Sequence, residues 1–174
     1  AVGAPNDDDG AGNAGAVYLL ELTQAGAVAS MLKISNAANL PGNLSTGDSF
    51  GMGMAAMGDL DGDGNVELGV AAPLADQGGM NKGRLHLLSL ANDGSVLQER
   101  RIGQGIGGFS GILDAQDQFG GRALCSLGDV NGDGTTDIAA GAFRDDDGGA
   151  DRGAFYVLFL NPSMTVIGHQ KISG

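Results

Sequence analysis

The chain has 174 residues, the size of one ordinary domain, and 42% of them are hydrophobic, which is enough for a buried core. Its 21 acidic and 9 basic side chains give a formal net charge of -12, which excludes the basic surface that nucleic-acid binding requires. No apolar run reaches the roughly 18 residues of a membrane-spanning helix, so we expect no membrane insertion.

The first 35 residues predict three short β-strands, at 2–4, 16–21 and 27–34, separated by glycine-rich turns. The first turn carries three consecutive aspartates, Asp7 to Asp9, and Asp145 to Asp147 repeat this feature later in the chain. Such a loop could hold a cation. A solvated acidic hairpin is the favoured interpretation, because the middle of the chain has lost most of that charge at Ala75 to Gly78.

The remainder of the chain predicts two sets of four strands. Residues 36–103 contain the first set, and residues 104–174 contain the second. Apolar, β-branched runs between turn signals place these strands at 50–57, 67–72, 84–90 and 96–102, and then at 119–127, 137–142, 154–160 and 165–172.

Three sequence anchors recur with the same two offsets, 68 and 70 residues, so the chain is an internal repeat. The anchors begin at Val2, Gly15 and Lys33 in the first copy. A fourth anchor, a Phe-Gly pair followed by an aspartate-rich loop, occurs only at Phe50 and Phe119. We therefore divide the chain into a truncated repeat (1–35), a second repeat (36–103) and a third repeat (104–174).

Eleven strands in about 2.75 repeats of roughly 69 residues predict an all-β fold made of β-propeller blades, each with four antiparallel strands. A β-sandwich with similar halves is the alternative, but a sandwich gives no reason for three anchors in register. A propeller ring needs about four to eight blades. We therefore expect either the rest of a longer propeller or other copies of the chain to close the ring.

Two aspartate-rich loops have the spacing of calcium sites. Oxygen-bearing residues alternate along each loop, a glycine at the sixth position allows a sharp bend, and the seventh residue can offer its backbone carbonyl. Six or seven hard oxygen ligands suit Ca²⁺ better than Mg²⁺. The predicted ligands of two structural calcium ions are Asp59, Asp61, Asp63, Asn65 and Glu67 in the first loop, and Asp129, Asn131, Asp133, Thr135 and Asp137 in the second.

An EF-hand would need a glutamate at the twelfth loop position and flanking helices. Val70 and Ala140 occupy that position, and both lie in runs typical of strands. The loops are therefore predicted to join two strands. Two solvated acidic turns without an ion are the remaining alternative.

The Phe50-Gly51 and Phe119-Gly120 pairs, the runs Val70-Ala71-Ala72-Pro73 and Ala140-Gly141-Ala142-Phe143, and the calcium loops between them resemble the FG-GAP repeats of the integrin α-subunit β-propeller and its bacterial relatives. The resemblance implies an extracellular or cell-surface location. The long period and the acidic loops look more like secreted bacterial proteins than like integrins. Glu67 replaces the final aspartate of the family, which predicts a more open or weaker first site.

Antiparallel strand order places the two calcium loops at one end of the blades and the longer, more variable loops at the other. Loops on a rigid scaffold commonly carry function. We expect an extracellular protein or glycan ligand at this second end, contacted by Phe109, Arg144 and Arg152.

We expect no enzymatic activity from this chain, because it shows no nucleophile motif and its two histidines, His86 and His169, stand alone on strands. Related propellers are appended to enzymes. The alternative is thus a non-catalytic or partial segment of a secreted carbohydrate-active or lipid-cleaving enzyme. The single cysteine, Cys125, is expected to be a buried, inert thiol.

Overall fold

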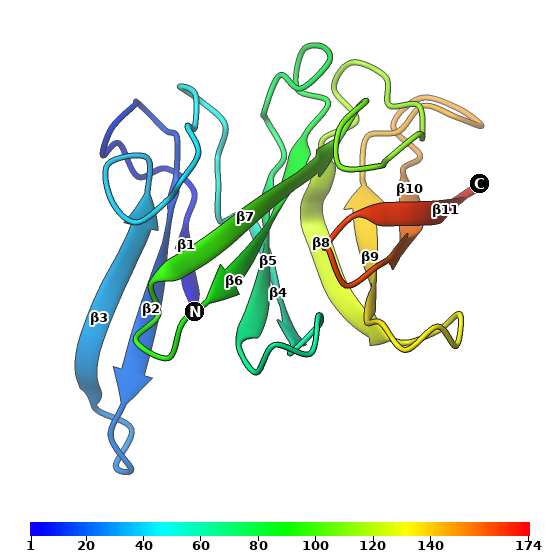
Figure 1. The fold of residues 1–174 in the computed structure, drawn as a ribbon. Coiled ribbons are helices and arrows are strands. Elements are labelled where there is room, and N and C mark those ends of the chain that lie inside the picture. Colours follow the sequence, from blue (N-terminus) through cyan, green and yellow to red (C-terminus); the bar gives the residue numbers. More distant parts are fainter.

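The structure, a computed structural model, describes residues 1–174 and consists of β-strands, turns and loops without a helix. Eleven strands form three antiparallel sheets that stand side by side in chain order (Figure 1). No helix long and apolar enough to cross a membrane is present. The arrangement is that of consecutive propeller blades in a ring that this chain does not close, as predicted.

Each sheet is built from strands that follow one another in the sequence. The first sheet contains β1 (Val2–Ala4), β2 (Ala16–Leu22) and β3 (Val28–Ser35). The second contains β4 (Gly53–Gly58), β5 (Val66–Ala72), β6 (Arg84–Leu90) and β7 (Val96–Gly103). The third contains β8 (Phe119–Gly128), β9 (Asp137–Ala142), β10 (Ala154–Leu160) and β11 (Val166–Ser173).

All eleven predicted strands are present, and the largest shift of a boundary is at β4, which begins at Gly53 instead of residue 50. Phe50 forms an isolated parallel bridge with Gly15 of the preceding repeat. Gly51 follows in the left-handed region, with φ of 94°, which a side chain would disfavour. The Phe-Gly pair therefore belongs to the junction between two sheets, and the paired strand starts after it.

The hydrophobic core lies between the sheets. Val17 and Ile34 of the first sheet pack with Phe50, Val70 and Leu88 in one cluster of 11 buried residues. The opposite face of the second sheet contributes Leu85, Leu87 and Ile102 to a cluster of 18 buried residues, together with Phe119, Tyr156 and Leu158 from the third repeat. Successive side chains of a strand point to opposite faces, so β6 supplies both clusters.

The loops collect at two ends of the sheets (Figure 1). One end carries the aspartate-rich hairpins at 59–65 and 129–136. The other end carries the loops at 5–15, 73–83 and 143–153 and the connectors at 36–52 and 104–118. This is the division predicted from antiparallel strand order.

The prediction of a buried thiol is wrong, because Cys125 is exposed. It lies on β8, one of the two edge strands of the third sheet, and the residues of β8 after Gly121 are exposed except for Leu124. The apolar run 123–127 suggested a covered strand. An edge strand, however, has a neighbour on one side only, so an apolar sequence does not guarantee burial there.

Candidate functional site

The first aspartate-rich loop holds three carboxylates close together. Oxygen atoms of Asp59, Asp61 and Glu67 all lie within 4.8 Å of one another. The loop keeps this shape because the backbone N–H groups of Gly62 and Gly64 donate hydrogen bonds to Asp59 Oδ1 and Oδ2, at 2.8 and 3.1 Å. Like charges at this separation repel one another, so the arrangement favours a cation between them.

Glu67 provides the strongest indication that a cation fits this loop. Its side chain is buried on β5, and its Oε2 accepts a hydrogen bond of 2.6 Å from the backbone N–H of Leu60. Its Oε1 is also buried and has no hydrogen bond of good geometry; the nearest polar group is the buried hydroxyl of Ser89 on the paired strand, which acts to lower the pKa of Glu67 but is itself without a well-aligned partner. Burial raises the pKa of Glu67, since the charged form is poorly solvated there. A buried, unpaired carboxylate oxygen beside two other carboxylates has the chemistry of a hard-metal ligand.

The second loop has the same turn with a different closing residue. Gly132 and Gly134 donate to Asp129 at 2.7 and 2.9 Å. Asp137 is fully buried, and its two oxygens accept hydrogen bonds from the backbone N–H groups of Leu160 (3.0 Å) and Val130 (3.1 Å). Asp137 thus joins the loop to the neighbouring strand β10, whereas Glu67 keeps one oxygen unpaired.

The other predicted metal ligands mainly hold the backbone of the loops. Asp63 accepts hydrogen bonds from the backbone and side-chain amides of Asn65, and the backbone bond contributes most to lowering its pKa. Asn131 donates through Nδ2 to Asp133 at 2.8 Å, and this bond is the main cause of the lowered pKa of Asp133. Asp133 also accepts from the backbone N–H of Thr135, which is buried. These side chains lie in the same two loops, but the close cluster of three carboxylates forms in the first.

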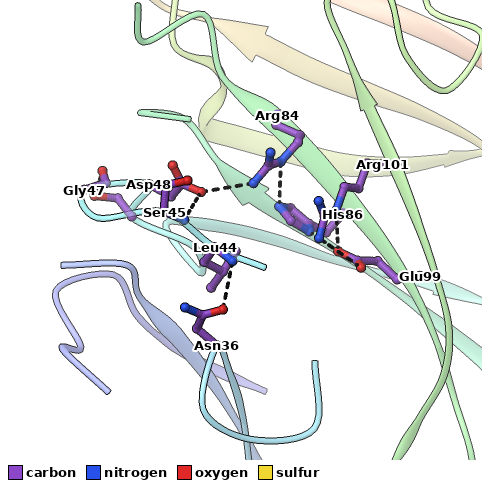
Figure 2. A network of polar contacts seen from close by, with 10 residues as sticks. Asn36, Leu44, Ser45, Gly47, Asp48, Arg84, His86, Glu99 and Arg101 are labelled. Atoms are coloured by element: carbon purple, nitrogen blue, oxygen red, sulfur yellow. Dashed lines mark hydrogen bonds and ion pairs between the residues drawn. The ribbon is translucent and has the colours of Figure 1, made fainter. Parts of the chain in front are cut away.

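A buried polar network, which sequence reasoning missed, crosses the face of the second sheet that packs on the first (Figure 2). Arg84 donates to Asp48 at 3.0 Å and to His86 Nε2 at 3.1 Å. His86 Nδ1 lies 2.6 Å from Glu99 Oε1, and Arg101 donates to the same carboxylate at 2.9 Å. The network links the connector before β4 to β6 and β7.

Burial and pairing set the charges in this network. Burial lowers the pKa of His86, so the neutral ring accepts from Arg84 and donates to Glu99. Burial acts to raise the pKa of Glu99, but hydrogen bonds from His86 and Arg101 outweigh it and lower this pKa to about 2. Both ring nitrogens of the fully buried His86 are therefore engaged within the protein. This supports a structural role for His86.

The outer repeats use a different arrangement at the equivalent positions. Asp7 accepts from Lys33 at 2.8 Å and from the Tyr18 hydroxyl at 3.1 Å. In the third repeat, Lys171 pairs with Asp145 and Asp147 and lies 5.5 Å from the centre of the Tyr156 ring. The acidic hairpins of the first and third repeats are therefore each anchored by a lysine from the last strand of their own sheet. Binding of a further cation by these hairpins stays a prediction.

The sequence contains a signal for both arrangements. The first and third repeats carry aspartate, tyrosine and lysine where the second has Ala75, His86 and Arg101. When one repeat has charged residues on two paired strands where the other repeats have smaller or apolar ones, the difference indicates a polar network that only this repeat forms. Arg84, for example, stands where the other repeats have alanine.

The residues predicted to contact a ligand are not equally accessible. Arg144 and Arg152 are exposed in the loop between β9 and β10. Phe109 is only 2% exposed and stacks on Phe119 with ring centres 5.1 Å apart. Phe109 is thus a core residue that fixes the connector, and it does not belong to the accessible surface of this end.

Residues 120–158 match the family model described as FG-GAP repeat. Integrin alpha-PS2 of Drosophila melanogaster is 33% identical over 161 residues, which cover 84% of this chain and 11% of that protein. Integrin alpha-2 of Bos taurus is 34% identical over 94 residues, which cover 54% of this chain and 8% of that protein. The chain therefore spans about a tenth of the length of the curated relatives it matches.

Proposed function

Because this chain belongs to the FG-GAP repeat family of integrin-like β-propellers, we propose that it is a calcium-stabilised adhesion or interaction module of an extracellular propeller. In this proposal calcium is structural, and the ligand is a protein or a glycan. The outward-facing loops provide recognition, and the sheets provide a rigid support.

The observation that carries the calcium part is the unpaired, buried Oε1 of Glu67 beside Asp59 and Asp61. These three residues, with Asp63 and the backbone carbonyl of Asn65, would hold one ion. Asp129, Asn131, Asp133, Asp137 and the carbonyl of Thr135 would hold the second. Each ion would offset the charge of a crowded hairpin and fix it between two strands.

The ligand part rests on the end of the sheets opposite the proposed calcium loops. Five loops or connectors meet there, and Arg144 and Arg152 are accessible on one of them. The same loop carries four aspartates, so recognition would depend on the individual groups: each exposed guanidinium can donate paired hydrogen bonds to a carboxylate or sulfate group of a protein or glycan.

Calorimetric titration with calcium tests the metal part, and we expect two ions per chain. Asp133→Ala should lower the stoichiometry by one. The matched control is Asp93→Ala, which removes the same charge from an exposed hairpin turn outside the two loops. An unchanged stoichiometry in Asp133→Ala, or an equal loss in the control, would refute the assignment.

Binding of the fluorescently labelled chain to an array of sulfated, uronic-acid and neutral glycans, and to purified extracellular-matrix proteins, tests the ligand part. We expect retention without turnover, and we expect the Arg144→Ala, Arg152→Ala double variant to reduce it. Release of a cleaved glycan product would instead favour a segment of a carbohydrate-active enzyme.

A further inference from the structure

A groove lies between the first sheet and the hairpin that joins β6 to β7 in the second sheet. It has a volume of about 320 Å³, at the small end of the range for ligand sites. Leu19 and Leu32 of the first sheet supply apolar surface, which the hairpin reaches at Gly94. Glu21 and Asp93 add one carboxylate from each sheet. Because antiparallel strands alternate in direction, the hairpin lies at the end of the sheets that carries the aspartate-rich loops.

The junction between the second and third sheets has a methionine side chain at the equivalent place. Met164 is the sequence equivalent of Gly94 and keeps a positive φ, 57° against 82°. Met164 is 1% exposed and packs in the same cluster as Leu87, the equivalent of Leu19. Leu87 is fully buried, whereas Leu19 is only partly buried. An unbranched side chain therefore fills the second junction where the first has a glycine and an open groove.

The second junction also contains an arginine that the first lacks. Arg100 is the equivalent of Leu32, and its Nε donates to the backbone carbonyl of Ser163 in the neighbouring hairpin, at 3.4 Å. No hydrogen bond connects a side chain of β3 with the hairpin at residues 91–95. The second junction thus holds a flexible aliphatic chain and a guanidinium of its own, and the first junction holds neither.

The charge of the open groove differs from that of its filled counterpart. Glu21 and Asp93 stand where the second junction has two serines. Glu21 Oε2 accepts a hydrogen bond of 2.7 Å from Ser30, and Asp93 Oδ1 accepts from the backbone and the hydroxyl of Ser95, at 2.9 and 2.6 Å. Each carboxylate thus has one oxygen held in place and one without a partner in the chain. No lysine or arginine of the chain pairs with either of them.

From this comparison we propose that the groove is a docking site for an arginine side chain of a partner protein. The aliphatic part of the arginine lies against Leu19 and Leu32, in the place that Met164 fills at the other junction. Its guanidinium pairs with Glu21 and Asp93. A guanidinium suits this position better than an ammonium group, because its N–H donors form a rigid fork that can serve two carboxylates. The net charge of -12 favours the approach of a basic segment.

This inference goes beyond the proposed function. It concerns the end of the sheets opposite the loops that carry Arg144 and Arg152, and it does not depend on a calcium ion. The Arg144→Ala, Arg152→Ala double variant should therefore leave docking in the groove unchanged.

The test titrates the isotope-labelled chain with the peptide acetyl-Gly-Arg-Gly-amide and follows the backbone amide signals by NMR. We expect saturable shifts that are confined to residues 19–21, 30–32 and 92–94. The same peptide with citrulline, which has the shape of arginine without its charge, should bind about fivefold more weakly, the ratio expected for a partly exposed ion pair. A lysine peptide that binds as tightly as the arginine peptide would overturn the assignment of a guanidinium.

Two double variants separate the groove from the general acidity of the chain. Glu21→Gln with Asp93→Asn removes both charges, keeps an acceptor at each position and should weaken binding about fivefold. The matched control is Asp114→Asn with Asp151→Asn, which removes the same charge from two exposed positions at the loop end and should leave binding unchanged. Shifts spread over the whole acidic surface, or an equal loss in both double variants, would overturn the proposal.

A further variant fills the groove from within. Leu32→Arg supplies the side chain that the second repeat has at this position, so it should compete with the peptide and abolish the local shifts. Unchanged binding of the arginine peptide to this variant would also contradict the proposal. Calcium titration of the same proteins reads out the proposed function separately.

Discussion

The second and third sheets have the same strand order and closely similar registers, but neighbouring sheets cover both faces of the second and only one face of the third. All seven residues of β6 are buried, whereas burial alternates along β10. The more completely buried strand is the less apolar one in sequence, since β6 contains Arg84, His86 and Ser89, whereas β10 consists of apolar and aromatic residues. The difference shows that a blade of this fold obtains much of its burial from the next blade.

The largest expected difference between the two sheets concerns two equivalent apolar residues, Leu85 and Phe155, on the face of each sheet that is turned away from the preceding sheet. Leu85→Ala should reduce the free energy of unfolding by about 2–5 kcal/mol, because it leaves a cavity in a closed core. Phe155→Ala should reduce it by less than about 1 kcal/mol, although the deleted side chain is larger, since Phe155 is already partly solvated. Denaturant titration of both variants measures the two values, and similar costs would contradict the comparison.

Acid should act on a feature that the second sheet alone has, the Glu99 network. The pKa of Glu99 is lowered from 4.5 to about 2 in the folded state, so the folded state favours its charged form by about 3 kcal/mol. This contribution is complete above about pH 4.5 and is lost as the pH falls toward 2.

The measurement is the difference in unfolding free energy between the original chain and Glu99→Gln, followed from pH 7 to pH 2.5. Glu67 and Asp117, whose pKa values are raised by burial, shift the stability in the opposite sense. They are present in both proteins and cancel in this difference. Parallel stability curves, with no convergence in acid, would show that the buried pairs around Glu99 do not depend on its charge.

The two aspartate-rich loops allow a comparison without calcium. In the presence of a chelator, Asp137→Ala should cost about 2 kcal/mol, because it leaves two backbone N–H groups without an acceptor. Glu67→Gln should be close to neutral, since it keeps an acceptor for Leu60 and removes a poorly solvated charge. Adding calcium should raise the melting temperature of Glu67→Gln less than that of the original chain, because the amide offers the ion one neutral oxygen in place of a carboxylate. A gain equal to that of the original chain would indicate that the unpaired oxygen plays no part in binding.

The elements of the fold follow from the sequence because they depend on local and repeated signals. The turn residues and apolar runs placed every strand, and the recurring anchors divided them into sheets. The loop spacing also identified where Asp59, Asp61 and Glu67 meet. Burial of individual residues was harder to predict, because it depends on whether another sheet or loop packs against the face on which the residue lies. Phe109 comes from an irregular connector, and Cys125 from an edge strand.

The Arg84 network was hidden for a related reason. Its members come from β6, β7 and the distant connector that holds Asp48, so no spacing in the sequence joins them. A comparison of the three repeats could have revealed that the second one has different side chains at these positions. It could not have shown that Arg84 lies 3.0 Å from Asp48, or that Asp117, the equivalent aspartate of the third repeat, has no arginine partner.

The smallest expected effect lies in the third sheet, where Tyr156 replaces His86. Its hydroxyl donates a hydrogen bond of 2.9 Å to the backbone carbonyl of Ile112, and this bond ties β10 to the connector that precedes β8. Tyr156→Phe removes the bond but keeps the ring contacts with Phe109 and Phe119, so it should cost about 1 kcal/mol. Thermal unfolding measures this as a fall of a few degrees in Tm, with Tyr18→Phe in the less covered first sheet as the matched control. Tyr18→Phe should reduce the free energy of unfolding by less, because the hydroxyl of Tyr18 donates to Asp7, which already pairs with Lys33. A larger loss in Tyr18→Phe would mean that the lysine pairs, and not the covered faces of the sheets, hold the outer repeats together.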